Sequence, residues 1–600
     1  MTHRIEDYAM IGDCRTAALV STSGSIDWLC LPRFDSPSCF SSLIGTQDHG
    51  FWQIAPTAQT QRVSRRYLDG SLVVATEFRT KQGRVELVDF MPIGHRGSHV
   101  VRIVRGLAGR VKMGCSVMVR FGYGEVVPWA EKPDDNTVWF ISGPDMLVLR
   151  SSVPLEAHDQ LASGTFTLAK GDEASFVLSY GQSYSEPPGA IGADAELRTT
   201  TEFWTEWSDR CAAADRWTDA VKRSLITLKG LSYGPSGGIV AAATTSLPEM
   251  LGSTRNWDYR YCWIRDAAFT LLAFLRAGHY DEAHSFRDWL LRAVAGSPQE
   301  LQIMYGVAGE RKLQEAEIPW LPGYENSAPV RVGNAAATQY QLDIYGELFD
   351  ALTLAARSGL TPVDRSPKLR HIILEHLQQV WKEPDSGMWE VRGEPQHFTL
   401  SKVMAWVAFD RAAAHEGLTP DEQDRSHYRR IADEIHADIC SRGIDPERGC
   451  FTQAYGSGHM DAGLLLLAPV GFLPASDERV LRTIEEVERR LLRDGLIIRY
   501  ETETDIDGLP PGEGAFLACS FWLVENYVLQ DRLKDAEKIF DRLVGLANDV
   551  GLLAEEYDPH EKRFLGNFPQ ALSHVALVNS GFALARAKRR EPLNGRDPTL

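Results

Sequence analysis

The strongest constraint on the fold of this chain is a change in hydrophobic period near residue 196. Before it, apolar residues fall in short β-type runs that Gly, Asp, Asn and Pro interrupt at spacings of roughly 10 to 15 residues. This pattern favours an antiparallel sandwich over alternating strands and helices. The strands that we expect cover residues 72–79, 84–91, 99–105, 112–121, 137–142, 146–150, 164–168 and 174–180.

After this point the apolar residues recur with the 3.6-residue period of α-helices. About eleven helices follow, and long connections that contain Gly and Pro join them. Such a series predicts an α-barrel or toroid. The helices that we expect lie around 225–228 and 268–275 and over residues 281–294, 335–357, 366–380, 401–415, 420–440, 475–492, 514–529, 533–548 and 570–588.

The charge balance excludes two classes of partner. The 600 residues include 81 acidic and 63 basic side chains, a net charge of −18, which repels nucleic acids and anionic membranes. No apolar run approaches the ~18 residues of a membrane span, and the N-terminal segment has acids where a signal peptide needs basic residues. We therefore expect a cytoplasmic protein whose nine cysteines, which form no C-x-x-C pair, are buried thiols.

Four connections combine aromatic, basic and acidic residues and are candidate sites, because loops on a rigid scaffold commonly carry function. In one of them Glu390 follows Trp389, and in another Glu555 and Glu556 are adjacent. The purely structural alternative is that such residues cap helices, fill the interface between two domains or lie on a solvated turn. The four connections cover residues 256–266, 385–392, 498–514 and 553–559.

No cofactor or metal is expected. The chain contains no P-loop, dinucleotide, H-E-x-x-H or G-x-S-x-G motif. The acidic loop near residue 505 has Gly514 where a calcium-binding EF-hand needs its closing Glu. Two carboxylates in separate loops, with Arg, Asp and Trp nearby, instead fit glycoside hydrolysis, in which one acid donates a proton and the other attacks or activates water. Aromatic faces would stack on sugar rings.

On these residues the sequence resembles glycoside hydrolase family 15, the glucoamylase-like and trehalase proteins, over essentially its whole length. Residues 5–20 and 24–30 are similar to the N-terminal region of the trehalase-like branch. The other matching signatures are residues 256–266, 323–324 with 329–334, 387–390 and 554–558.

The resemblance implies a multidomain α and β fold, in which an N-terminal antiparallel β-sandwich precedes an (α/α)6 barrel. We therefore divide the chain into a β-sandwich over 1–195, a helical linker over 196–215, a catalytic barrel over 216–590 and a tail over 591–600. It also implies inversion at the anomeric carbon, with Glu390 as general acid and Glu555 as general base, and a carboxyl separation of ~6.5 to 9.5 Å. We expect Glu390 to be desolvated against Trp389 and protonated, and Glu555 to be ionised.

The residues expected to bind substrate also follow from the resemblance. Arg265 and Asp266 match the pair that grips the non-reducing glucose, and Arg499 matches an arginine beside it. Tyr324 and Arg331 match ligands toward the leaving sugar. The full set of expected substrate-binding residues is Trp263, Arg265, Asp266, Tyr324, Arg331, Trp389, Arg499 and Glu556.

Two departures from the fungal glucoamylase pattern bear on the substrate. Val391 follows the acid where that pattern has Glu, and Glu556 follows the base where it has Gln, which leaves Glu556 as a rival base. We expect an α,α-trehalase. The alternatives are a glucoamylase or glucodextranase acting on α-1,4 or α-1,6 gluco-oligosaccharides, or a catalytically silent carbohydrate-binding protein. The partners that we expect are a small-molecule sugar and, at most, further copies of the chain.

Overall fold

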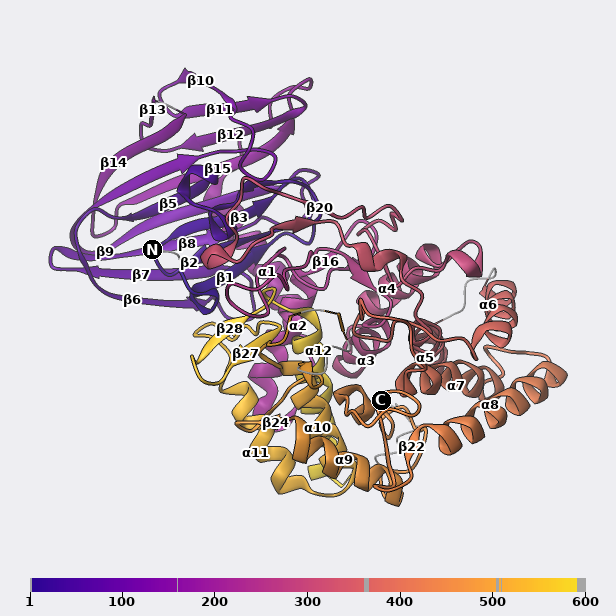
Figure 1. Cartoon of the computed structure of the whole chain (residues 1–600). Helices are drawn as coiled ribbons and strands as arrows, with labels where there is room; N and C mark the ends of the chain where they lie inside the picture. The colour runs from indigo at the N-terminus through magenta and orange to yellow at the C-terminus, as the bar shows by residue number, and fades with distance from the viewer. Residues whose placement is uncertain (1–2, 159, 361–365, 503–506, 509, 591–600) are drawn as a thin grey trace.

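The N-terminal part of the chain is an antiparallel β-domain (Figure 1). A computed structural model describes residues 3–158, 160–360, 366–502, 507–508 and 510–590. The strands are β1 Tyr8–Gly12, β2 Ala17–Ser21, β3 Ser25–Cys30, β4 Ser38–Phe40, β5 Phe51–Pro56, β6 Thr60–Tyr67, β7 Val74–Thr80, β8 Gly83–Phe90, β9 His99–Met118, β10 Trp129–Asp134, β11 Thr137–Ser142, β12 Asp145–Ser151, β13 Glu156–His158, β14 Leu161–Ala169 and β15 Glu173–Gln182.

The long strand β9 joins the two layers of this domain. Its first part pairs with β8 and β15, and its second part pairs with β5 and β14. The two strands expected over 99–105 and 112–121 are therefore one. The intervening glycines mark close backbone contact, since a Cβ at Gly106 would lie 1.9 Å from the Ala169 carbonyl oxygen.

Twelve α-helices follow in the described residues. Their bounds are α1 Ala193–Asp209, α2 Thr218–Gly230, α3 Ala267–Ala277, α4 Tyr280–Ala293, α5 Asp343–Arg357, α6 Ser366–Val380, α7 Thr399–Ala414, α8 Glu422–Arg442, α9 Glu478–Leu491, α10 Leu517–Leu529, α11 Leu533–Val544 and α12 Ala571–Lys588. None of them is long and apolar enough to cross a membrane. The predicted antiparallel β-domain and the helical domain that follows it are confirmed.

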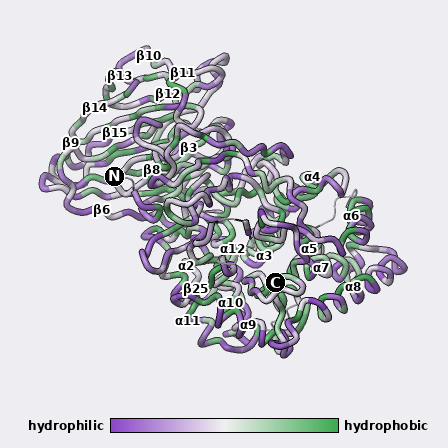
Figure 2. The backbone as a smooth tube through the Cα atoms, in the orientation of Figure 1, coloured by the Kyte–Doolittle hydropathy of each residue, from purple (hydrophilic) through white to green (hydrophobic). Residues whose placement is uncertain are grey.

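Six elements form the inner ring of the helical domain, and each inner element packs on the next. Their order is α3, α5, α7, the short 3-10 helix η8 (Ala462–Leu466), α10 and α12, after which α12 packs back on α3. Inner helices such as α7, α10 and α12 are buried on nearly all sides. Outer helices such as α8 alternate between hydrophilic and hydrophobic residues (Figure 2). This closed ring is an α/α barrel.

Several expected segments differ in detail from the structure, and no strand was expected over residues 8–67, where β1 to β6 lie. The helix expected over 335–357 begins only at Asp343, because residues 335–338 form a 3-10 turn capped by Asn334, and Ala336 in this turn lines a cavity. The helix α1 begins at Ala193, a few residues before the 195/196 boundary that we drew. The expected tail over 591–600 lies outside the described residues.

The β-domain packs against loops of the barrel through buried polar contacts. The Trp28 indole donates to the Ala243 carbonyl oxygen at 2.8 Å. Arg260 is fully buried and donates to the Tyr123 hydroxyl and to the Ser36 carbonyl oxygen, both at 2.9 Å. The same guanidinium pairs with Asp258 at 2.7 Å. The loop that leads into α3 is therefore held from the β-domain side.

Candidate active site

The predicted site residues lie in loops that enter the N-terminal ends of the inner elements. Asp266 is the residue directly before α3, and the Glu390 loop precedes α7. Arg499 precedes α10, and Glu555 precedes α12. Because α7 and α12 are three places apart in a ring of six, the loops of Glu390 and Glu555 enter from opposite sides of the ring.

A small cavity lies among these loops. Its volume is about 30 Å³, which is room for roughly two water molecules. Of the expected residues, Glu390, Trp389 and Arg499 line it. The complete lining is Glu249, Arg255, Trp257, Tyr259, Asn334, Ala336, Trp389, Glu390, Arg392, Arg499, Tyr500 and Asp507.

The carboxyl group of Glu390 is held on one oxygen only. Its Oε1 accepts hydrogen bonds from Trp263 Nε1 and Arg265 Nη1, each at 3.0 Å. Its Oε2 receives no hydrogen bond from a described residue and belongs to a side chain that lines the cavity. The backbone of Glu390 has φ 52°, a left-handed conformation that costs free energy for a residue with a Cβ.

Arg265 connects this carboxyl group to further acids. It donates to the Met388 carbonyl oxygen at 2.7 Å and to Asp266 Oδ1 at 3.0 Å. Behind the pair, Asp343 on α5 is buried, and neither of its carboxyl oxygens has a hydrogen-bond partner among the described residues. Burial, and then the charge of Asp385, raise the pKa of Asp343 to about 7. Arg265 therefore lies in an acid-rich environment that keeps it charged.

Glu555 is 1% exposed and is held by the loop that follows it. Its Oε2 accepts the Asn567 N–H at 3.1 Å. Gly566 has φ +72°, and a Cβ there would lie 2.5 Å from the same oxygen. Burial is the largest cause that raises the pKa of Glu555 to about 8, and the charge of Glu249 raises it further. Arg499 and the hydrogen bonds from Asn567 and Tyr259 oppose this rise in pKa.

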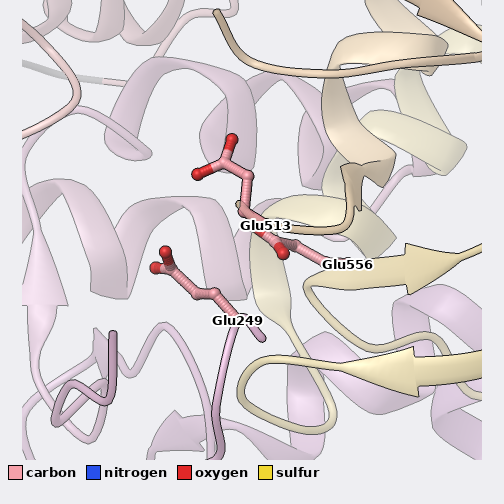
Figure 3. A group of neighbouring side chains, drawn as sticks. All are labelled: Glu249, Glu513 and Glu556. Atoms are coloured by element: carbon pink, nitrogen blue, oxygen red, sulfur yellow. The ribbon is translucent and has the colours of Figure 1, made fainter. Parts of the chain in front are cut away.

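Three more glutamates, Glu249, Glu513 and Glu556, lie near one another (Figure 3), and Glu556 follows Glu555 in the chain. Oxygens from the three carboxyl groups lie within 4.8 Å of one another, as the ligands of a cation would. Arg499 Nη2, however, lies 2.6 Å from Glu513, 2.8 Å from Glu249 and 3.6 Å from Glu556. A guanidinium nitrogen thus takes the central place, and we assign no metal to this group.

Four further expected substrate ligands also contact protein groups: Trp263, Trp389, Arg331 and Tyr324. We expected the Trp389 indole beside Glu390, but it donates to Asp461 Oδ1 at 2.8 Å. The indole that donates to Glu390 is that of Trp263. Arg331 lies 4.6 Å from the Trp257 ring centre. Tyr324 is fully buried, and its hydroxyl contacts His3 and Arg563. It does not line the cavity, whereas Arg331 adjoins it through Trp257.

Several lining residues were not singled out from the sequence. Tyr259 and Trp257 lie inside the 256–266 signature, so the sequence located them near the site but did not indicate their roles. The guanidinium carbon of Arg392 lies 4.0 Å from the centre of the Trp257 ring, the same ring that Arg331 contacts. Glu249 stands in a segment without any motif, and no local signal could have identified it.

Comparison with known proteins identifies the family of the chain. The model of the family described as "Glycosyl hydrolases family 15" matches residues 216–582. The model described as "Trehalase-like, N-terminal" matches residues 1–202. The chain belongs to glycosyl hydrolases family 15. It is a glycoside hydrolase, and the family match covers every site loop described above.

Relatives of this family 15 hydrolase align over nearly all of its length. A trehalase of Mycolicibacterium smegmatis is 38% identical over 98% of this chain and 92% of its own. A trehalase of Thermoplasma volcanium is 34% identical over 98% of this chain and 95% of its own. A bacterial glucoamylase complexed with acarbose has the same fold, with a TM-score of 0.72 and 14% identity over 98% of this chain and 95% of its own.

Proposed function

We propose that this hydrolase is an inverting, exo-acting α-glucosidase whose substrate is α,α-trehalose. The observation that carries the proposal is the placement of the two carboxyl groups in loops from opposite sides of the inner ring. Inversion needs an acid at the leaving oxygen and a base that activates water on the other face of the sugar, ~6.5 to 9.5 Å apart. A retaining pair would stand only ~5 Å apart.

Glu390 is the proposed general acid. Arg265 and Trp263 fix its Oε1, which leaves Oε2 to carry the proton into the cavity. As the bond between C1 and the glycosidic oxygen breaks, this proton passes to that oxygen and the second glucose leaves. Asp266 and Arg265 would hold hydroxyl groups of the first glucose. Bonds of this kind accelerate the reaction when they strengthen in the transition state.

Glu555 is the proposed general base. In its ionised form it takes a proton from the water whose oxygen bonds to C1. Because burial raises the pKa of Glu555 to about 8, activity should fall as the pH falls through the pKa of this group. Glu556 is the weaker candidate, since its Oε2 accepts the Gly514 N–H at 2.8 Å and its Oε1 faces Arg499.

Trehalose is favoured as the substrate by the N-terminal as well as the catalytic region. The two relatives named above at 38% and 34% identity are trehalases and cover both regions. Val391 is buried with Phe398 and Ala454, so the position after the acid offers no polar group to a longer glucan. All nine cysteines are free thiols, which fits a reducing compartment, and we therefore propose that the reaction takes place in the cytoplasm.

The test is glucose release from trehalose, maltose, isomaltose and soluble starch, measured side by side. We expect turnover of trehalose, and a loss of about 10²- to 10⁴-fold in kcat for Glu390→Gln and for Glu555→Gln. Glu394→Gln and Glu561→Gln are matched controls, because both side chains are exposed in the same two loops. Preference for maltose, isomaltose or starch would refute the trehalase assignment, and no turnover of any sugar would favour a binding protein.

A further inference from the structure

Glu249 is a buried glutamate that none of the family signatures contains, yet it lines the catalytic cavity. Its Oε2 accepts a hydrogen bond from Arg499 Nη2 at 2.8 Å, and Arg255 Nη1 lies 3.8 Å away. The carbonyl oxygen of the preceding residue, Pro248, accepts the Gly566 N–H at 2.8 Å. Since Gly566 packs against the Glu555 carboxyl group, this bond places the Glu249 segment directly beside the base.

Among the described residues, acids outnumber basic groups around Glu249. Glu249, Glu513, Glu555 and Glu556 are four acids, and the guanidinium groups that face them are those of Arg255 and Arg499. Asp507 adds a further acid on Arg255, at 2.5 Å. Burying uncompensated negative charge is costly, so burial raises the pKa of Glu249, Glu555 and Glu556. Arg499 and Arg255 oppose this rise for Glu249, because their charges favour its ionised form. Tyr259, Tyr500 and Cys519 are further titratable groups that face it among the described residues.

Arg499 neutralises Glu555 only in part, because its hydrogen bonds go to other acids. Its Nη2 donates to Glu249 and to Glu513, and its Nε donates to Glu513 at 3.1 Å. The positive charge of Arg499 therefore stabilises the carboxylates of Glu249 and Glu513 more directly than that of Glu555. Removal of Glu249 would free one of these hydrogen bonds and remove one negative charge, and both effects make ionised Glu555 more stable.

We propose that Glu249 is a positioning residue for the catalytic base: by holding Arg499 and placing a negative charge beside Glu555, it makes Glu555 a stronger base and sets the pH above which the enzyme is active. The inference rests on the proposed role of Glu555. It is consistent with the rise in the pKa of Glu555, in which the charge of Glu249 is the largest contribution after burial. It also gives Glu249 a function although its own oxygens contact arginines.

The kinetic test compares the pH profiles of kcat on trehalose for the wild type, Glu249→Gln, Glu249→Asp and Glu513→Gln. We expect Glu249→Gln to move the acidic limb to lower pH by about one unit or more and to lower kcat on the plateau. Glu249→Asp keeps the charge and should largely restore the wild-type limb. Glu513→Gln is the matched control: it loses contact with the same Arg499 but should move the limb less. An unmoved limb in Glu249→Gln, or an equal movement in Glu513→Gln, would overturn the inference.

A second measurement separates this inference from the proposed function. Infrared difference spectra follow protonated carboxyl groups during a pH titration and need no turnover, and Glu555→Gln identifies the band of Glu555. In Glu249→Gln this band should disappear at lower pH than in the wild type. An unchanged midpoint refutes the role of Glu249 whether or not trehalose is a substrate. An inactive wild type with a shifted band refutes the proposed function alone.

Discussion

Replacing Arg260 with methionine removes the cation of an ion pair that is fully buried where the β-domain meets the site loops. Arg260 Nε and Nη2 donate to the two Asp258 oxygens at 2.9 and 2.7 Å. Without them, Asp258 keeps the backbone N–H groups of residues 260 and 333, both at 3.1 Å. Leaving one charge of a buried pair uncompensated costs about 3 to 5 kcal/mol, a large part of the ~5 to 15 kcal/mol that stabilise a typical protein.

Equilibrium unfolding in urea, followed by fluorescence and circular dichroism, measures this cost. Tyr123→Phe removes one hydrogen bond to the same guanidinium and should cost about 2 kcal/mol. Adding Asp258→Asn to Arg260→Met removes the stranded charge, so the double variant should be more stable than Arg260→Met alone. A cost below about 1 kcal/mol for Arg260→Met, or a double variant less stable than the single one, would refute the reasoning.

Three further changes have defined outcomes. Gly566→Ala should lower kcat at least tenfold by displacing Glu555, whereas Gly456→Ala, which has the same φ of +72° but no atom within 4 Å of the added Cβ, should leave kcat unchanged. Burial lowers the pKa of His574 to about 3. The stability that depends on neutral His574 should therefore be fully present above pH ~6.5, and the free energy of unfolding should fall by about 2 kcal/mol between pH 7 and pH 5. His574→Gln should flatten this pH dependence in urea titrations. Trp389→Phe deprives Asp461 of an indole donor and should cost about 1 to 3 kcal/mol in thermal unfolding, against no measurable cost for Trp129→Phe at a 67% exposed site.

Much of the fold could be predicted because each element carries its own period. The helix expected over 366–380 has the same bounds in the structure, and that over 533–548 ends four residues earlier at Val544. Two of the errors arose where glycine or alanine has a role beyond local structure. The glycines in β9 allow close backbone contact between strands, and Ala336 belongs to a turn that lines the cavity.

The candidate site could be predicted only as far as it lies in contiguous motifs. Trp263, Arg265 and Glu390 are brought together, since their hydrogen bonds join two signatures. Glu249 pairs with Arg499, 250 positions away in the chain, and nothing in its neighbourhood distinguishes it from a surface glutamate. Tyr324 lies within a signature, but its hydroxyl is turned toward the N-terminal segment, a contact that only the tertiary structure determines.

The stereochemistry of the first products tests the central proposal most directly. Both glucose units of α,α-trehalose have the α configuration, so inversion releases one β-glucose from the attacked unit and one α-glucose from the leaving unit. Proton NMR at enzyme concentrations that outpace mutarotation should therefore show equal amounts of the two anomers at the earliest times. Early formation of α-glucose alone would show retention and would contradict the assignment of Glu390 as acid and Glu555 as base.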